Sequence, residues 1–425
     1  MNREAIEGMA EERCDVMLYV QHLLGIGHIR RGVVLARAFQ RAGLKVVFVT
    51  GGLPIGDLGL PSVEGLPSVE VVQLPPARAQ DETFAVIVDA QDRPIDEAWM
   101  AARRAQLLDL YRRKRPRVVM IELYPFGRRK MRFELEPLVA EARRADPPAL
   151  IACSLRDIVN RPERPEKASW MLETFRRDFD LLYVHGDPAF FRIETSFPEA
   201  AALSERLHYT GYVTEAGRVL PPPKADDPEA GHGEVIVSVG GGAVGRHLVE
   251  AALAARPLTA LAETPWRILI GPNMPEPEYR QLADLAPQGV VVERARSDFA
   301  LLLTRARLSI SQAGYNTIME VLAAGLPGVV VPFAGGTETE QTLRAERLAA
   351  EGYLTVVDER SLSGESLAAG IARALEKRTT NTRDPFRMEG ADETARHLQA
   401  LLAAENGGSE ATPVPPPASS LEQGA

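Results

Sequence analysis

The sequence is poor in cysteine and histidine, and this scarcity already limits the classes of protein that it can encode. Its 425 residues include two cysteines, Cys14 and Cys153, each in or beside a hydrophobic strand-like run. We therefore expect two buried core thiols in a reducing compartment, without a disulfide framework. The seven histidines are scattered and no DxD motif follows a strand-like run, so the sequence predicts no metal site.

Long apolar runs and a surplus of basic residues are also missing. No run of 18 apolar residues occurs, and the first 13 residues are polar and acidic, so neither a membrane span nor a signal peptide is expected. The formal net charge of −9 argues against nucleic-acid binding, because phosphate contacts need a surplus of Lys and Arg. We expect a cytoplasmic protein with at most peripheral membrane contact.

The sequence does contain a strand-then-helix rhythm, which runs through the chain twice. A chain of 425 residues is comfortable for two domains, and the alternation predicts an α/β fold with a doubly wound parallel sheet in each. A Pro-rich stretch without apolar periodicity separates the two runs. The predicted organisation is a Rossmann-like domain at 14–216, a linker at 217–233, a second Rossmann-like domain at 234–384, a helix at 385–404 and a disordered tail at 405–425.

The predicted strands locate the loops that matter for function, because ligands of doubly wound sheets bind at the carboxyl ends of the strands. If the two sheet edges face each other, both halves hold one ligand. The predicted strands are Asp15–Val20, Lys45–Thr50, Val69–Leu74, Arg117–Glu122, Leu150–Ser154, Leu181–His185 and Leu207–Gly211, followed by Glu234–Val239, Arg267–Gly271, Val290–Glu293, Leu308–Ser311, Gly328–Pro332 and Leu354–Val357.

A glycine-containing loop follows the first strand of each half. Gly25 and Gly27 precede His28 at the first turn of a helix, where a histidine neutral near pH 7 can take a proton from an attacking hydroxyl. The alternative is a helix-start turn in which His28 is incidental. In the second half, Gly240-Gly241-Gly242 directly follows a strand, and its N–H groups can bind a diphosphate; the alternative is a tight turn without a ligand.

The stretch from Ser311 to Pro327 is the most informative part of the sequence. Gly314 gives a turn after a strand, and Asn316 or Thr317 can cap the following helix. Glu320 is expected in the first turn of that helix, where a carboxylate facing a cleft can bind both ribose hydroxyls. The alternative is a glutamate that only stabilises the helix start.

Polar residues at two further places are candidates for sugar or acceptor binding. Glu340 and Gln341 begin a helix and offer donors and acceptors for sugar hydroxyls, unless they are only a solvated helix start. Four residues that follow first-half strands can bind an acidic acceptor or orient His28: Glu122, Arg128, Arg129 and Arg156.

The run Ser311–Phe333, followed by Glu340-Gln341, resembles the donor-binding half of the GT-B glycosyltransferase family that includes the peptidoglycan UDP-N-acetylglucosamine transferase. Gly25–His28 is similar to the amino-terminal glycine loop of that family, and Ile121–Arg129 resembles a stretch of its bacterial "predicted glycosyltransferase" relatives. The resemblance departs at Arg344, where the family has its sugar-binding asparagine.

The resemblance implies two Rossmann-like domains facing across a cleft, with the acceptor on the first and the nucleotide sugar on the second. It implies that Glu320 holds the ribose and Gly27, Gly241, Gly242, Gly314, Asn316 and Thr317 lie around the donor. It further implies that Gln341, with Glu340, holds the sugar, and that His28 lies near the reacting centre. The implied donor is a nucleoside diphosphate sugar, and the choice of UDP as its nucleotide rests on the family alone. No other cofactor is expected.

These observations predict an inverting, metal-independent transfer of a hexose or N-acetylhexosamine to a hydroxyl acceptor, lipid-linked or small. His28 would remove the acceptor proton. A nucleotide-sugar hydrolase and an epimerase on the same fold are alternatives, and so is a non-catalytic sugar-nucleotide-binding subunit. A Rossmann dehydrogenase is disfavoured, because neither glycine loop has the dinucleotide fingerprint with an acidic residue about 20 positions later.

Overall fold

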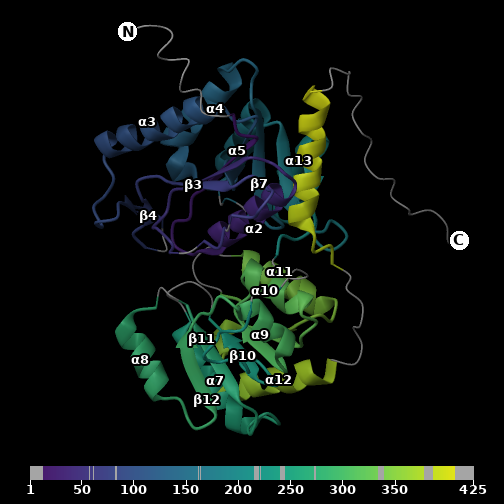
Figure 1. Cartoon of the computed structure of the whole chain (residues 1–425). Coiled ribbons are helices and arrows are strands. Elements are labelled where there is room, and N and C mark those ends of the chain that lie inside the picture. The colour runs from purple at the N-terminus through teal and green to yellow at the C-terminus, as the bar shows by residue number, and fades with distance from the viewer. Residues whose placement is uncertain are drawn as a thin grey trace, which may run out of the picture.

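The chain folds into two α/β halves, each built around its own parallel sheet (Figure 1). The computed structural model describes residues 13–56, 58–60, 62–81, 84–160, 162, 164–214, 220, 222–239, 245–271, 274–333, 339–377 and 386–406. The predicted α/β class with two Rossmann-like halves is confirmed. Each predicted strand is present, with ends that differ from the prediction by at most two residues.

The first sheet has seven strands among the described residues, and every neighbouring pair is parallel. Helices of the same half cover it. In sheet order the strands are β3 (Val69–Gln73), β2 (Val46–Thr50), β1 (Val16–Val20), β6 (Val118–Glu122), β7 (Leu150–Arg156), β8 (Leu181–His185) and β9 (Leu207–Tyr209). The helices are α2 (Gly27–Arg41), α3 (Glu97–Lys114), α4 (Arg132–Arg144), α5 (Pro165–Asp178) and α6 (Ile193–Ser196).

The second sheet has six strands within the described ranges, again all parallel. In sheet order they are β12 (Val290–Arg294), β11 (Trp266–Ile270), β10 (Val235–Ser238), β13 (Leu308–Ser311), β14 (Gly328–Val330) and β15 (Thr355–Val356). The helices of this half are α7 (Arg246–Ala255), α8 (Glu276–Asp284), α9 (Phe299–Arg305), α10 (Tyr315–Ala323), α11 (Glu340–Ala350) and α12 (Gly364–Lys377).

The central strands, such as β1, are apolar throughout because both faces of the sheet are covered there, whereas the edge strands β3 and β12 carry polar and exposed residues. Successive side chains of a strand point to opposite faces. In β1, Met17 and Tyr19 join one core cluster, whereas Val16, Leu18 and Val20 join the cluster on the other face. All five are fully buried.

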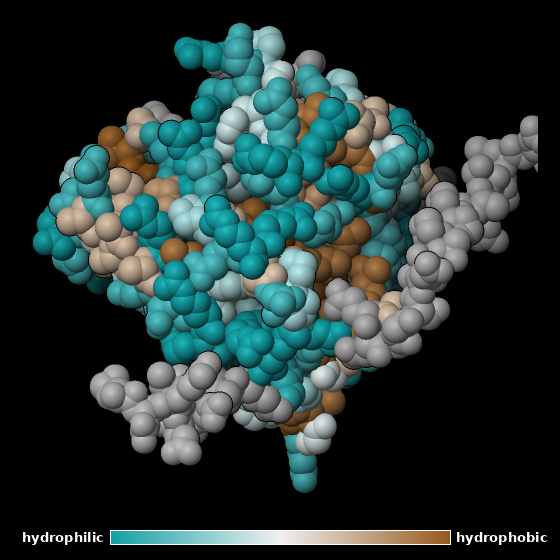
Figure 2. Space-filling view, turned by 90° about the horizontal axis from the view of Figure 1, so that it is seen from above, coloured by the Kyte–Doolittle hydropathy of each residue, from teal (hydrophilic) through white to brown (hydrophobic). Residues whose placement is uncertain are grey.

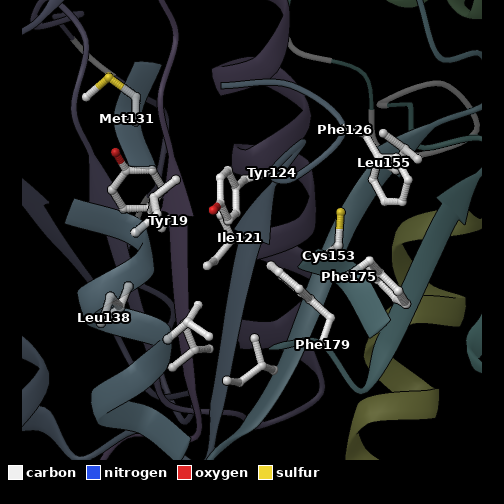
Figure 3. Close-up of a cluster of buried hydrophobic side chains, with 14 of the residues drawn as sticks. Tyr19, Ile121, Tyr124, Phe126, Met131, Leu138, Cys153, Leu155, Phe175 and Phe179 are labelled. Carbon is white, nitrogen blue, oxygen red and sulfur yellow. The ribbon is translucent and has the colours of Figure 1, made fainter. Parts of the chain in front are cut away.

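The core between the first sheet and helices α4 and α5 is rich in aromatic rings (Figure 3). Phe175 and Phe179 stack with ring centroids 5.4 Å apart, and Phe126 and Tyr124 pack against them at tilted angles. Cys153 lies among these rings. Both cysteines are free and buried, which confirms the prediction of core thiols without a disulfide.

The last helix, α13 (Gly390–Asn406), returns from the second half and packs along α2 of the first (Figure 1). Its apolar residues Ala391, Ala395, Leu398 and Leu402 belong to the same core cluster as α2. The chain therefore crosses between the halves twice, and its C-terminal helix completes the first half.

Viewed from the first-half end, the surface is mostly hydrophilic, and its hydrophobic residues lie in separate patches (Figure 2). None of the helices in the described part of the chain combines the length and the apolar character needed to cross a membrane.

Candidate functional site

A cavity of about 1170 Å³ lies between the two halves, at the carboxyl ends of both sheets. Figure 1 shows α2 on the underside of the first half, facing α10 and α11 at the top of the second. The first-half wall comes from the loops after β1, β6 and β7. The second-half wall comes from the ends of β10 and β11 and from the loops after β12 and β13.

The wall of this cavity is strongly basic. Its described lining includes nine Arg and Lys residues and no Asp or Glu. Eight of them belong to the first half, and Arg296 to the second. Because cations gathered on one wall create a positive potential in the cavity, the first half presents a surface suited to an anionic group. The nine are Arg30, Arg31, Arg128, Arg129, Lys130, Arg132, Arg156, Lys167 and Arg296.

His28 and Glu122 form a pair on the first-half wall. Strands β1 and β6 are neighbours in register, so their carboxyl ends lie side by side and bring the start of α2 next to the last residue of β6. Nδ1–H of His28 donates to Oε1 of Glu122 at 2.9 Å, across 94 residues of sequence. Glu122 is completely buried, whereas the His28 side chain is 16% exposed and lines the cavity.

The electrostatics of this pair keep the imidazole neutral. Burial lowers the pKa of His28 to about 3, although Glu122 raises it. Burial raises the pKa of Glu122, but the adjoining His28 and the Arg31 cation hold it well below its usual range. An ionised Glu122 accepts a hydrogen bond from Nδ1–H, which leaves Nε2 of His28 as the nitrogen with a lone pair.

The start of α10 forms the opposite wall. Gly314, Asn316 and Thr317 all line the cavity, as does Tyr315. Asn316 does not cap the helix as predicted, because α10 begins one residue before it and Gly314 is the N-cap. Its Nδ2 instead donates to the carbonyl of Gly27 at 3.1 Å, which joins the helix starts of the two halves.

Glu320 lies one turn further along α10 than the sequence predicted. The helix begins at Tyr315, so Glu320 is in its second turn and no acidic residue lies in the first. Glu320 is half-buried, and it is not part of the described cavity lining. The part of Glu320 in ribose binding stays a prediction.

Glu340 is paired with two arginines instead of lining the cavity. It is 2% exposed; Arg156 contacts its Oε2 at 2.6 Å and Arg344 contacts its Oε1 at 2.7 Å. Arg344 also holds Asp157 of the first half through two bonds, at 2.6 and 3.0 Å. Each carboxylate oxygen of Glu340 thus already has an arginine partner, and its part in sugar binding stays a prediction. Gln341 accepts a bond from the backbone N–H of Phe333 at 3.2 Å.

The predicted first-half residues lie together but play different parts. Arg128 and Arg156 line the cavity, and Arg128 donates to the carbonyl of Gln21 at 2.6 Å. Burial lowers the pKa of Arg128 to about 10. Arg129 is exposed, with its guanidinium 5.0 Å from the ring centroid of Trp170.

Sequence reasoning missed two residues of the site and placed two others where the structure gives no description. Arg31 and Tyr315 were not predicted, although Arg31 lies three residues after His28 and therefore on the same helix face. Gly241 and Gly242 lie outside the described residues. Among the residues that are described, no group of three His, Cys, Asp or Glu side chains has an arrangement that could hold a metal ion.

Comparison with known proteins identifies relatives of part of the chain. Residues 235–399 match the family model described as the glycosyltransferase family 28 C-terminal domain. The UDP-N-acetylglucosamine–N-acetylmuramyl-(pentapeptide) pyrophosphoryl-undecaprenol N-acetylglucosamine transferase of Methylococcus capsulatus is 34% identical over 128 residues, 30% of this chain and 33% of the relative. The enzyme of the same name from Geobacter sulfurreducens is 28% identical over 184 residues, 43% of this chain and 48% of the relative. The chain thus spans less than half the length of these curated relatives.

Solved structures extend the similarity of fold to nearly the whole chain. The calicheamicin glycosyltransferase CalG4 superposes with a TM-score of 0.56 at 18% identity, covering 94% of this chain and 100% of that one. MurG of Acinetobacter baumannii superposes with a TM-score of 0.55 at 15% identity, covering 91% and 99%. The chain therefore has a GT-B fold, its residues 235–399 match the glycosyltransferase family 28 C-terminal domain, and it resembles the family of the peptidoglycan N-acetylglucosamine transferase.

Proposed function

We propose that this protein transfers a sugar from a nucleoside diphosphate sugar to an acceptor hydroxyl, with His28 as the general base. The observation that carries the proposal is the His28–Glu122 pair at the wall of the cavity between the halves. A buried carboxylate that holds Nδ1–H of a neutral imidazole leaves the other nitrogen ready to accept a proton. The relatives named above support the choice of reaction.

The chemistry assigned to His28 is the removal of one proton as the acceptor oxygen attacks the anomeric carbon. The bond from that carbon to the departing diphosphate breaks in the same step, so the anomeric configuration inverts. His28 becomes an imidazolium, and Glu122 stabilises the new positive charge because it is already ionised and bonded to Nδ1. Glu122 is thus proposed to orient His28 and not to touch the acceptor.

We assign the donor to the second-half wall. Tyr315, Asn316 and Thr317 form the first turn of α10 and line the cavity. The first N–H groups of a helix have no acceptor within that helix, and the positive end of its dipole favours a diphosphate. Gly241 and Gly242 are proposed to add N–H groups, Glu320 to hold the ribose and Gln341 the sugar. UDP is the proposed nucleotide because the curated relatives are named as UDP-N-acetylglucosamine transferases.

We assign the acceptor to the first-half wall and propose that it carries a negative charge beside its reacting hydroxyl. Arg128, Arg129, Lys130, Arg132 and Lys167 lie on that wall, and the described lining contains no carboxylate to balance them. A phosphate or diphosphate next to the acceptor sugar fits such a wall. The curated relatives are named for an acceptor attached to pyrophosphoryl-undecaprenol, which supports a lipid-linked acceptor here.

The test separates donor binding from turnover. Thermal shifts with UDP, UDP-N-acetylglucosamine and other nucleoside diphosphate sugars identify the donor, since a ligand that binds the folded state raises the apparent stability. His28→Ala should then lower turnover by about 10²–10⁴-fold and leave the thermal shift with donor nearly unchanged. The control is His232→Ala, which removes an exposed histidine that is not part of the cavity lining.

Each alternative function predicts a different product. Unchanged turnover in His28→Ala would remove this residue as the base. Donor consumption at full rate without any acceptor would identify a hydrolase, and a product that keeps its nucleotide would identify an epimerase.

A further inference from the structure

Arg31 has no role in the sequence-based predictions or in the proposed reaction. It lies one turn after His28 on α2, and its side chain is 1% exposed. Its Nη2 contacts the same Glu122 oxygen that accepts Nδ1–H of His28, and lies 3.4 Å from Nδ1 itself. A permanent cation is therefore buried directly beside the pair, with Glu122 shared between two partners.

The opposite side of Arg31 meets the second half of the chain. Its guanidinium carbon lies 5.6 Å from the centroid of the Tyr315 ring, within the range of a cation–π contact. Tyr315 begins α10 and is itself held across the cleft: its hydroxyl donates to the carbonyl of His185 at 2.9 Å and accepts from N–H of Val213 at 3.0 Å. One side chain thus joins the pair on the first half to the donor wall on the second.

We propose that Arg31 is a positioning residue. It compensates part of the negative charge of Glu122 beside His28, and it connects the His28–Glu122 pair to Tyr315 of the second half through a cation–π contact. The proposal rests on the proposed role of His28 as a base. With Arg31 in place, part of the Glu122 charge is already compensated, so Glu122 orients the imidazole without favouring its protonation before the acceptor reacts. The contact with Tyr315 makes this charge balance depend on the two halves being closed against each other.

The charges around His28 explain why Arg31 can decide its protonation. Glu122 favours the imidazolium, whereas Arg128 and Arg156 oppose it, and the Arg31 guanidinium lies 3.4 Å from Nδ1 of the ring. Glu340 lies on the second-half side, where it pairs with Arg156. Arg156 is paired with Glu340, so part of its charge is compensated. Arg31 is the cation whose contact with the pair is direct, and its loss would leave Glu122 free to stabilise a proton on His28.

The protonation of His28 can be followed without any substrate, by NMR of the imidazole ¹⁵N nuclei during a pH titration, with the His28 signal assigned from a His28→Asn variant. In the native protein His28 should remain neutral, with the proton on Nδ1, down to about pH 5. Arg31→Met should move its titration upward by at least about one pH unit, because an unopposed carboxylate in contact favours the imidazolium. Arg31→Lys, which keeps the charge, should restore most of the native titration.

The link to the second half has its own pair of variants. Tyr315→Leu removes the ring beneath Arg31 and should shift the His28 titration in the same direction as Arg31→Met, by a smaller amount. Tyr315→Phe keeps the ring and should leave the titration unchanged. If Arg31→Met does not fold, Arg31→Lys and Tyr315→Leu still measure the coupling.

Activity provides a second readout once the donor is known. The acid limb of the turnover profile of Arg31→Met should move upward with the NMR titration, while its thermal shift with donor stays as in the native protein. An unchanged His28 titration in Arg31→Met would overturn the proposal, whatever happens to activity. Full turnover in His28→Ala would instead refute the base and leave the measured coupling standing, so the two failures are distinct.

Discussion

The ion pair between Asp157 and Arg344 joins the two halves, and its contribution to stability can be measured by mutation. Asp157 directly follows β7 of the first half and is completely buried, and Arg344 on α11 is 1% exposed. Two bonds join them, at 2.6 and 3.0 Å. Replacing Asp157 by Asn keeps the shape of the side chain but leaves a buried guanidinium short of one negative partner.

The expected magnitude follows from what remains around Arg344. Removing one partner of a buried ion pair typically destabilises a protein by about 3–5 kcal/mol, because the other charge stays buried without compensation. Glu340 still contacts Arg344 at 2.7 Å in the variant, so we expect a loss near the lower end, about 3 kcal/mol. Replacing both partners, as Asp157→Leu with Arg344→Met, should recover most of this loss, because no unpaired charge is then buried.

Urea unfolding followed by tryptophan fluorescence measures the effect in each half separately. Trp99 and Trp170 belong to the first half and Trp266 to the second. A variant that keeps only Trp266 therefore reports on the unfolding of the second half, and a variant that lacks Trp266 reports on the first half. In Asp157→Asn the two transitions should both move to lower urea and separate. A loss below about 1 kcal/mol would mean that the pair behaves like a solvated surface pair, and would refute the reasoning.

Two further predictions concern stability. Burial lowers the pKa of His28 and His185 to about 3 and of His397 to about 4, so each binds a proton less readily when folded than when unfolded. The free energy of unfolding should therefore be highest above about pH 6.5 and decrease as the pH falls towards 3. At pH 5 the loss should be about 2 kcal/mol for each of His28 and His185, and less for the partly exposed His397. Urea midpoints at pH 7 and 5 measure this loss, and equal midpoints would contradict it. Gly32→Ala should destabilise by about 1–3 kcal/mol, because the new Cβ would lie 2.8 Å from Cγ2 of Val20; an unchanged melting temperature would show that α2 can move away from β1.

Local patterns predicted the elements of this fold because each is specified by neighbouring residues. Continuous apolar runs such as Val16–Val20 need cover on both faces, and the helices between them supply it. The alternation of strands and helices along the sequence also predicted where each strand ends. The glycine loop before His28 could therefore be placed between a strand and the start of the next helix. Helix ends were predicted less accurately. Glu320 lies in the second turn of α10 and not in the first, because the helix begins at Tyr315.

What only the tertiary structure decided is which charged residues meet. The sequence indicated that Glu122, Arg156 and Glu340 lie at strand ends or helix starts, but their partners come from distant segments. Glu122 meets His28 because β1 and β6 are neighbours in the sheet, and Glu340 meets Arg156 because the two halves close against each other. Charge pairing is set by distances in the folded chain and not by spacing along it, so the sequence determined the folds of the halves, and their packing determined the site.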